Sequence, residues 1–187
     1  MIRTAICMAS GPSLYPDDVE YCKGKGRVYV VNDTYRMAPW ADVLYACDLP
    51  WWDHHEGVPG FAGERWTLDL EASRKYGLNH IGTLHNEIWS TRPDAIATGR
   101  NSGFQALNLA AHSADRIILL GYDMKLGENR QRHWFGEHPG ALNKNSDYHL
   151  FIKAFRDAAP LIKQQVINCS RSTALDCFPR ANLMDVL

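Results

Sequence analysis

The stretch Thr4-Ala5-Ile6-Cys7-Met8-Ala9-Ser10-Gly11-Pro12-Ser13-Leu14 decides the fold of this chain. The apolar run from Ile2 to Met8 predicts a buried strand, and the small polar residues Ser10 to Ser13 end that strand. The segment Tyr15-Pro16-Asp17-Asp18 follows as a helix start, with a proline in the first turn and carboxylates at the positive end of the helix dipole. A strand that passes directly into a helix is typical of α/β proteins, in which ligands bind beyond the carboxyl ends of the strands.

The same alternation continues along the chain. Arg27 to Val31 is rich in β-branched residues and predicts a second strand. Helical patterns are expected from Asn101 and from about Asp147 to Lys163. Further strands are expected at residues 42–46, 64–70, 116–120 and 165–168. We therefore expect a single domain over residues 1–187, with a Rossmann-like three-layer α/β/α fold and a mostly parallel sheet.

Composition and charge exclude several classes of protein. The 187 residues are 45% hydrophobic and 22% charged, with a net charge of −1, which gives no field for nucleic acid or an anionic membrane. No run of about eighteen apolar residues and no signal-peptide pattern is present. The five cysteines are odd in number and lack the spacing of metal ligands. The sequence predicts a cytoplasmic protein with reduced thiols and no nucleic-acid partner, and it leaves open whether copies form a homo-oligomer.

Two donor-rich turns are expected to form the two halves of one nucleotide pocket. The first consists of Ser10, Gly11, Pro12 and Ser13, where glycine lets the backbone approach a phosphate or ribose. The second is Asn101-Ser102-Gly103 at the start of a helical pattern. A plain strand-to-helix turn and a helix N-cap are the alternatives. Neither the glycine-rich dinucleotide fingerprint nor a Walker phosphate loop is present.

Polar residues at the ends of other predicted strands extend this pocket. Asn32 and Asp33 end the second strand, Asp48 follows the third, and Asp123 follows the strand at 116–120. Because the carboxyl ends of parallel strands meet at one edge of a sheet, these side chains are expected to line one cleft. Helix capping is the alternative for each Asn and Asp.

The segment His133-Trp134-Phe135-Gly136-Glu137-His138 is expected to carry the chemistry. Imidazole exchanges a proton near neutral pH because its ordinary pKa is about 6.5. His54-His55 is a second candidate, with an aromatic-rich helix or an acceptor-site rim as equal explanations. No third ligand stands at a zinc spacing, so no metal site is expected here. The surrounding loop, about 124–146, contains glycines and many polar residues and is expected to be a lid that orders over a bound nucleotide.

These motifs, in this order, resemble a known group of enzymes. The pattern consists of Gly-Pro-Ser-Leu at 11–14, Asn32, Asn-Ser-Gly at 101–103, Gly-x-Asp at 121–123 and a late segment with two histidines. From Ile6 to about Leu183 the chain is similar to the small bacterial sialyltransferases that use a cytidine-monophosphate sugar donor. It is similar, more distantly, to the archaeal-type 6-hydroxymethylpterin pyrophosphokinases and to short phage-encoded relatives of both.

The resemblance implies where a donor would bind. Gly11, Pro12 and Ser13 would face the donor nucleotide, Asn32 would lie near its sugar or phosphate, and Ser102 with Gly103 would hold it from the opposite side. Only fourteen residues separate Asp123 from His138, where the sialyltransferases have a longer lid. The acceptor surface must therefore differ, and sialic acid is not supported as the transferred sugar.

The resemblance also implies catalytic roles. His138 corresponds to the general base, Glu137 would orient its ring or raise its pKa, and His133 is the rival base. Lys125 stands where the family has a tyrosine that stabilises the leaving phosphate, and Arg130 and Arg132 follow it. Cations can stabilise that charge electrostatically.

Three functions remain open on the sequence alone. The first is a nucleotide-dependent transferase that moves a glycosyl group from a nucleotide-activated donor to a small-molecule or glycan acceptor, with no required cofactor. The second is a pyrophosphokinase-type phosphotransferase in which Asp33, Asp48 or Asp123 holds magnesium. The third is a nucleotide-binding protein without catalysis. Metal dependence separates the first two, and mutation of His138 separates the first from the third.

Overall fold

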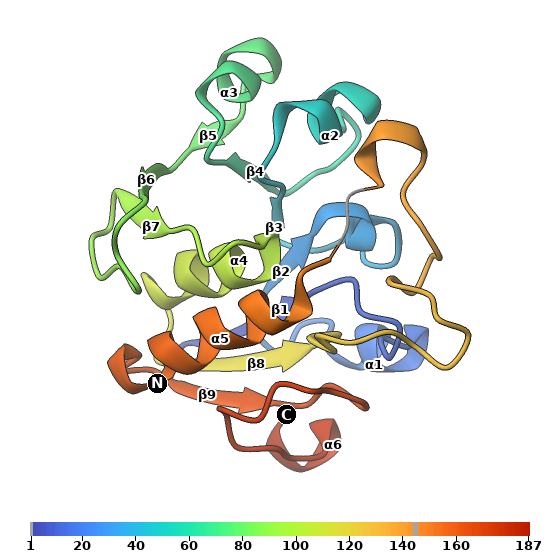
Figure 1. The fold of residues 1–187 in the computed structure, drawn as a ribbon, viewed down its shortest axis with the longest axis vertical. Coiled ribbons are helices and arrows are strands. Elements are labelled where there is room, and N and C mark those ends of the chain that lie inside the picture. Colours follow the sequence, from blue (N-terminus) through green and yellow to red (C-terminus); the bar gives the residue numbers. More distant parts are fainter. Residues whose placement is uncertain (1, 144–145) are drawn as a thin grey trace.

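A computed structural model describes residues 2–143 and 146–187 and shows an α/β fold built on one large sheet (Figure 1). The sheet has seven strands in the order β5-β4-β3-β2-β1-β8-β9, and each neighbouring pair is parallel. Its strands are β1 (Thr4–Met8), β2 (Arg27–Val31), β3 (Val43–Tyr45), β4 (Glu64–Thr67), β5 (Asn79–His80), β8 (Arg116–Leu120) and β9 (Gln165–Asn168). A separate parallel pair consists of β6 (Gly82–Leu84) and β7 (Ala95–Ala97). The predicted Rossmann-like fold class is confirmed.

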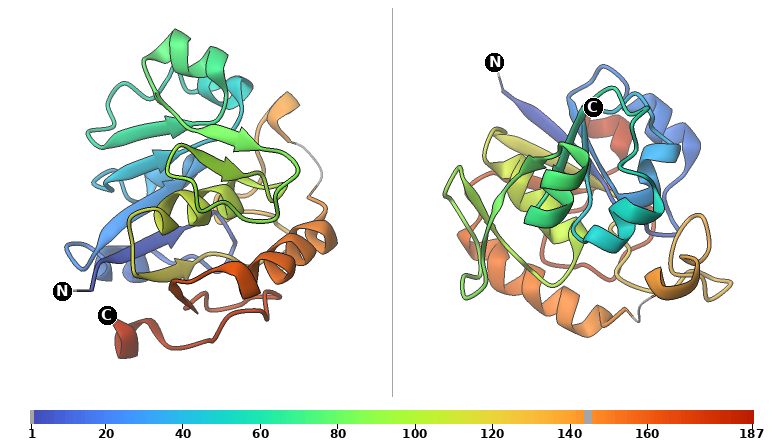
Figure 2. Two further views of the ribbon diagram at one scale, coloured as in Figure 1. Left: turned by 90° about the vertical axis from the view of Figure 1, so that its left-hand side faces the viewer. Right: turned by 90° about the horizontal axis from the view of Figure 1, so that it is seen from above.

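Helices cover both faces of the large sheet (Figure 2). One face carries α4 (Ser102–Ala111) and α5 (Tyr148–Ala158). The other face carries α1 (Pro16–Tyr21), α2 (Leu49–His54), α3 (Leu70–Tyr76) and α6 (Leu183–Val186). Short 3₁₀ helices also lie within the described residues: η1 (Asn32–Arg36), η2 (Gly140–Leu142) and η3 (Ala159–Leu161).

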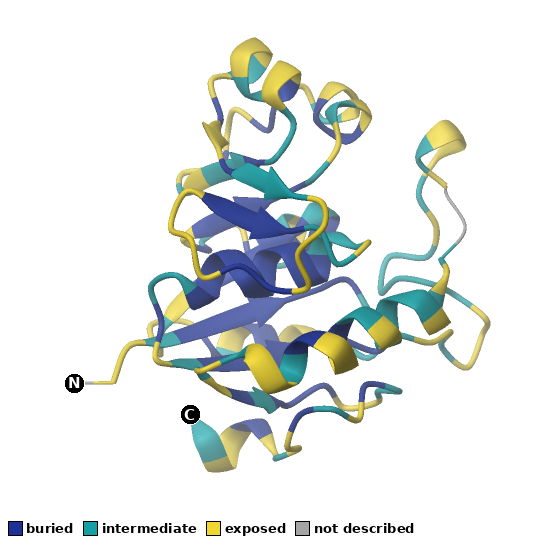
Figure 3. Cartoon of the chain, turned by 60° about the vertical axis from the view of Figure 1, so that its left-hand side comes forward, coloured by how far each residue is buried: buried dark blue, intermediate teal, exposed yellow. Residues whose placement is uncertain are grey.

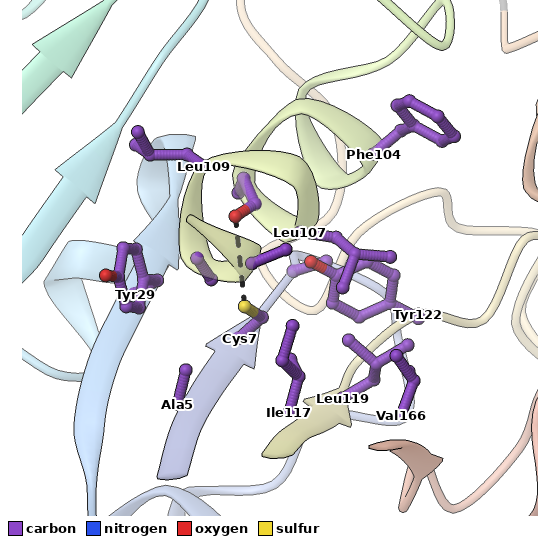
Figure 4. Packing of buried hydrophobic residues seen from close by; sticks show 14 of the residues in the cluster. Ala5, Cys7, Tyr29, Phe104, Leu107, Leu109, Ile117, Leu119, Tyr122 and Val166 are labelled. Atoms are coloured by element: carbon purple, nitrogen blue, oxygen red, sulfur yellow. Dashed lines mark hydrogen bonds between the residues drawn. The ribbon is translucent and has the colours of Figure 1, made fainter. Parts of the chain in front are cut away.

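The central strand β1 supplies both halves of the core. Ala5 and Cys7 pack beneath α4, and the Cys7 thiol donates a long hydrogen bond of 4.0 Å to the carbonyl of Ala106 (Figure 4). Ile6 and Met8 point to the opposite face, because successive side chains of a strand alternate. The central strands β1, β2, β3 and β8 are accordingly buried, whereas the edge strand β5 and the outward faces of the helices are exposed (Figure 3). This arrangement explains the continuous apolar runs in the sequence.

The order of the strands reverses between β1 and β8. From β1 the chain proceeds through β2, β3, β4 and β5 on one side, and β8 and β9 lie on the other. The turns after these two strands are joined by backbone hydrogen bonds of 2.9 Å, from Ala9 N–H to the Leu120 carbonyl and from Gly11 N–H to the Gly121 carbonyl. A crevice at such a switch point is the usual ligand site of an open α/β sheet.

The predicted strands at 27–31, 116–120 and 165–168 are confirmed to the residue. The strands predicted at 42–46 and 64–70 are present but shorter. The helix predicted to run to Lys163 ends at Ala158 and continues only as η3, since the ring of Pro160 cannot continue an α-helix. Among the described residues, no helix has the length and apolar character needed to cross a membrane.

Candidate functional site

The turns after β1 and β8 and the start of α4 surround one cavity of about 130 Å³ at the switch point. The structure therefore brings together the two segments that the sequence predicted to be halves of one pocket. The predicted residues that line this cavity are Ser10, Gly11, Asn32, Asn101, Ser102, Gly103, Asp123, Lys125, Arg132 and His133. Ser146, Tyr148 and Phe151, at and before the start of α5, also line it and were not predicted. No sequence motif marked them, because they precede or begin an ordinary amphipathic helix.

Two further cavities adjoin the central one, so that a cleft follows the carboxyl edge of the sheet. A cavity of about 600 Å³ shares Asp123 and Lys125 with it and is also lined by Pro12 and Ser13. A smaller cavity of about 70 Å³ shares Asn32 and Ser102 with it and is lined by Cys47, Asp48, Pro50, Trp51, His138 and Leu142. The large cavity also has Arg171 and Ser172 in its wall, which follow β9 and which the sequence analysis missed.

The first predicted turn is fastened to β8 by Asp123. The backbone N–H of Ser13 donates to Oδ2 of Asp123 at 2.8 Å, and the Ser13 hydroxyl donates to Oδ1 at 2.7 Å. Burial raises the pKa of Asp123, although these hydrogen bonds act in the opposite direction. Both carboxylate oxygens of Asp123 thus accept hydrogen bonds from Ser13.

Gly11 is a glycine because of packing. A Cβ at this position would lie under 3.0 Å from Oδ1 of Asp123 and from the carbonyl oxygen of Gly121. The Gly121 carbonyl and the Asp123 carboxylate, both after β8, fill the space that a side chain would need. Packing is therefore sufficient to require a glycine here, and the approach of a phosphate to Gly11 stays a prediction.

At the second predicted turn, the N-cap interpretation of Asn101 is correct. Its Oδ1 accepts a hydrogen bond of 2.9 Å from the Phe104 N–H, and its Nδ2 donates to the Gly99 carbonyl at 3.1 Å. Ser102 is the first residue of α4 and lines both the central and the small cavity. The positive end of the α4 dipole therefore faces the cleft, where it favours an anion.

A buried carboxylate, Asp33, stands at the centre of a second group of side chains. It lies in η1 directly after Asn32, whose φ of 49° is unusual for a residue other than glycine. Trp51 Nε1 donates to Asp33 Oδ2 at 3.0 Å, and the ring nitrogens His55 Nε2 and His138 Nδ1 lie 3.6 and 3.4 Å from its two oxygens. Burial opposes ionisation, but the contacts with His55, Trp51 and His138 outweigh it and lower the pKa of Asp33 to about 2. Asp33 is therefore a carboxylate at neutral pH.

His138 lies between Asp33 and the small cavity. Its side chain is 11% exposed, and Nδ1 is buried on the Asp33 side, which leaves Nε2 as the nitrogen for a ligand. Burial lowers the pKa of His138 below 6.5, against the attraction of Asp33. The ring is therefore neutral at pH 7 and able to accept a proton.

Of the two roles predicted for Glu137, its charge does raise the pKa of His138, but its carboxylate pairs with Arg132 and does not orient the ring. Glu137 pairs with Arg132, whose Nε donates to Glu137 Oε2 at 2.5 Å. Asp33 lies beside the ring, with Oδ2 3.4 Å from Nδ1, although Nδ1 forms no hydrogen bond within the described residues. The sequence marked Asp33 as a strand-end residue but gave no signal that a loop more than ninety residues away would contact it.

The segment 133–138 is held over the end of β1. Ser10 contacts it twice: its carbonyl accepts from the Trp134 N–H at 3.0 Å, and its hydroxyl lies 3.0 Å from His133 Nδ1. Trp134 Nε1 also donates to the Thr34 hydroxyl at 3.4 Å. Figure 1 shows the yellow-to-orange connection from β8 to α5 along this edge of the molecule. Residues 144–145 of the predicted lid lie outside the described residues, and its movement on ligand binding stays a prediction.

The described residues include no group of three or more His, Cys, Asp or Glu side chains placed to hold a metal ion. Asp33 and Asp123, two of the three predicted magnesium ligands, instead have protein partners at hydrogen-bond distance. Asp48 lies in the wall of the small cavity.

Asp33→Asn is expected to reduce stability at pH 6 by roughly 2 kcal/mol, because a pKa about two units below its ordinary value corresponds to that free energy. A depressed pKa stabilises the fold above about pH 4, and this contribution is lost as the pH falls towards 2. Urea unfolding of both proteins between pH 2 and 7 measures the difference. Asp17→Asn, which removes an exposed carboxylate, is the control. A difference that is the same at pH 2 and pH 6 would contradict the prediction.

Comparison of the chain with models of known protein families and with curated proteins found no match.

Proposed function

We propose that this protein transfers a glycosyl group from a nucleotide-activated donor to an acceptor hydroxyl, with His138 as the general base. The observation that carries the proposal is the pair of Asp33 and His138 at the wall of a cleft on the carboxyl edge of the sheet. An ionised carboxylate behind a neutral imidazole fixes the ring and stabilises the imidazolium that forms when the ring takes a proton.

The small cavity is the place of the acceptor in this proposal. Its wall includes His138, so that a hydroxyl bound there can give its proton to Nε2 while its oxygen attacks the anomeric carbon of the donor. Asn32 and Ser102 lie at the border between this cavity and the central one. The anomeric carbon of the donor, at which one bond forms and the other breaks, would therefore lie at this border.

In this proposal the central cavity binds the phosphate of the donor nucleotide. The first residue of α4 brings the positive end of a ten-residue helix, and Lys125 adds a cationic side chain to the same wall, which also holds Arg132 in its pair with Glu137. These groups favour the negative charge that remains on the nucleotide when the sugar leaves. The adjoining cavity of about 600 Å³ leaves room for the rest of the donor.

The magnesium-dependent alternative has less support. It requires carboxylates with oxygens directed at a metal, whereas Asp123 accepts two hydrogen bonds from Ser13 and Asp33 accepts one from Trp51. The donor set of the cleft fits an anion better than a cation.

A thermal-shift screen with nucleoside mono- and diphosphates, with and without magnesium, tests the proposal. A nucleotide at about 100 times its dissociation constant is expected to add about 2.7 kcal/mol of stability. The same gain is expected without magnesium. Lys125→Glu is expected to weaken binding, and Lys163→Glu, on an exposed residue outside the cleft, is the control with the same charge change. Stabilisation that requires magnesium would favour the pyrophosphokinase, and stabilisation by no nucleotide would contradict a nucleotide site.

A further inference from the structure

We infer that His133 is a second catalytic residue, a neutral hydrogen-bond donor whose Nε2–H contacts the phosphate oxygen that leaves with the nucleotide. The inference rests on the proposed function and extends it, because it gives the two histidines of one segment opposite tasks. His138 accepts a proton from the acceptor, and His133 donates a hydrogen bond to the leaving group.

The contact between Ser10 and His133 determines which nitrogen of the His133 ring carries the proton. The Ser10 side chain is buried, and its Oγ lies 3.0 Å from Nδ1 of His133. Among the described residues, Nδ1 is the acceptor within hydrogen-bond distance of this hydroxyl. A buried hydroxyl that cannot donate its hydrogen loses free energy. The hydroxyl therefore donates to Nδ1, and the single proton of the neutral ring lies on Nε2.

The His133 ring is held between two aromatic neighbours at the wall of the central cavity. The Phe135 ring is stacked on His133, with 4.9 Å between centroids and an angle of 8°, and the His138 ring meets it edge-on at 4.8 Å. His133 lines the central cavity, and no hydrogen bond to its Nε2 is found within residues 2–143 and 146–187. Nε2–H is thus left for a ligand in the cavity that also receives Lys125, Arg132 and the start of α4.

The third step is the charge of the ring. Burial lowers the pKa of His133 to about 4, and the neighbouring His138 and Arg132 act in the same direction, while Glu137 and Asp33 oppose them. The ring stays neutral at pH 7 and keeps one N–H and one lone pair. A neutral imidazole held in one tautomer is an effective donor to an oxygen that becomes negative.

The reaction balances with these two roles. His138 Nε2 takes the proton of the acceptor hydroxyl, and the acceptor oxygen forms a bond to the anomeric carbon. The bond between that carbon and the phosphate oxygen breaks, and the oxygen leaves with the electron pair. His133 Nε2–H strengthens its hydrogen bond to this oxygen and keeps its proton. The proton on His138 passes to water when the product leaves.

The first test measures the tautomer without any turnover. Long-range ¹H–¹⁵N spectra of the full chain distinguish a ring nitrogen that carries hydrogen from one that does not, and His133→Gln identifies the His133 signals. The expected result is hydrogen on Nε2 and none on Nδ1 from pH 5 to pH 8, with a mixture of tautomers in Ser10→Ala. Hydrogen on Nδ1, or a doubly protonated ring at pH 7, would overturn the inference even if the protein is a transferase.

The second test is kinetic and uses the transferase assay of the donor found in the nucleotide screen. His133→Leu is expected to lower kcat by about 10²–10³-fold, the usual loss on removing one such donor. His133→Gln, whose amide reaches the place of Nε2–H, is expected to recover much of the rate. The dependence of the rate on His138 protonation must persist in both variants. Loss of that dependence in His133→Leu would make His133 the base and overturn the inference. Absence of any turnover together with the predicted tautomer would count against the proposed function alone.

Discussion

Replacing His138 by alanine is expected to lower the rate of glycosyl transfer by about 10²–10⁴-fold, the range typical for loss of a positioned general base. Nucleotide affinity is expected to change little, because His138 lines the small cavity and the nucleotide phosphate is assigned to the central one. Steady-state rates measure the loss of turnover, and the shift of the protein's unfolding temperature on nucleotide binding measures the affinity.

The pH profile gives this prediction a second measurement. Burial lowers the pKa of His138, so the wild-type rate is expected to rise with pH to a plateau, with a midpoint below 6.5. His138→Ala is expected to lack this rise. His85→Ala, at an exposed histidine after β6, is the control and should leave rate and profile unchanged. Wild-type turnover in His138→Ala would remove this residue from the chemistry.

Replacing Gly11 by valine is expected to destabilise the protein by about 3 kcal/mol or more, which is the upper part of the range for overpacking a buried position. A Cβ at Gly11 would press on the Gly121 carbonyl and on the Asp123 carboxylate, and neither is free to move. Gly11 N–H is bonded to that same carbonyl, and Asp123 accepts two hydrogen bonds from Ser13. Loss of nucleotide binding would then follow from loss of the turn.

Urea unfolding measures this effect directly. Gly60→Val is the matched control, since nothing lies within 4 Å of a Cβ at that position, and a change within about 0.5 kcal/mol is expected there. Equal unfolding midpoints for the two variants would show that the turn after β1 can shift away from β8, contrary to the packing described above.

The sheet was largely predictable from local sequence. Arg27–Val31 and Arg116–Leu120 are short, continuously apolar and bounded by polar or glycine residues, so the apolar run and, in Arg27–Val31, the β-branched residues were sufficient. The small helix α1 was also predictable, from the proline and the carboxylates in its first turn, but α2 and α3 were not. α2 and α3 have six and seven residues, too few for a helical period to appear, and α2 has a proline and two tryptophans after Leu49, whose packing depends on the rest of the core.

The sequence predicted which edge of the sheet holds the site, but it did not predict which side chains contact one another there. Strand ends identify residues such as Ser10, Asn32 and Asp123 because parallel strands finish together. Which carboxylate faces which histidine depends on the path of a long loop, and the sequence favoured the neighbour Glu137 over the distant Asp33. His55 shows the same limit, since its place beside Asp33 follows from how α2 packs on η1.

The pairing of β1 with β8 also determines when this protein can fold during its synthesis. Thr4 pairs with Arg116, so β1 leaves the ribosome before a partner strand that is made more than a hundred residues later. Until then β1 has one open edge, and an apolar open edge invites pairing with another chain. Long-range parallel pairing of this kind is slow. Chains that end before Arg116 would therefore present an unpaired strand edge that favours aggregation, because the pairing of β1 with β8 cannot yet form.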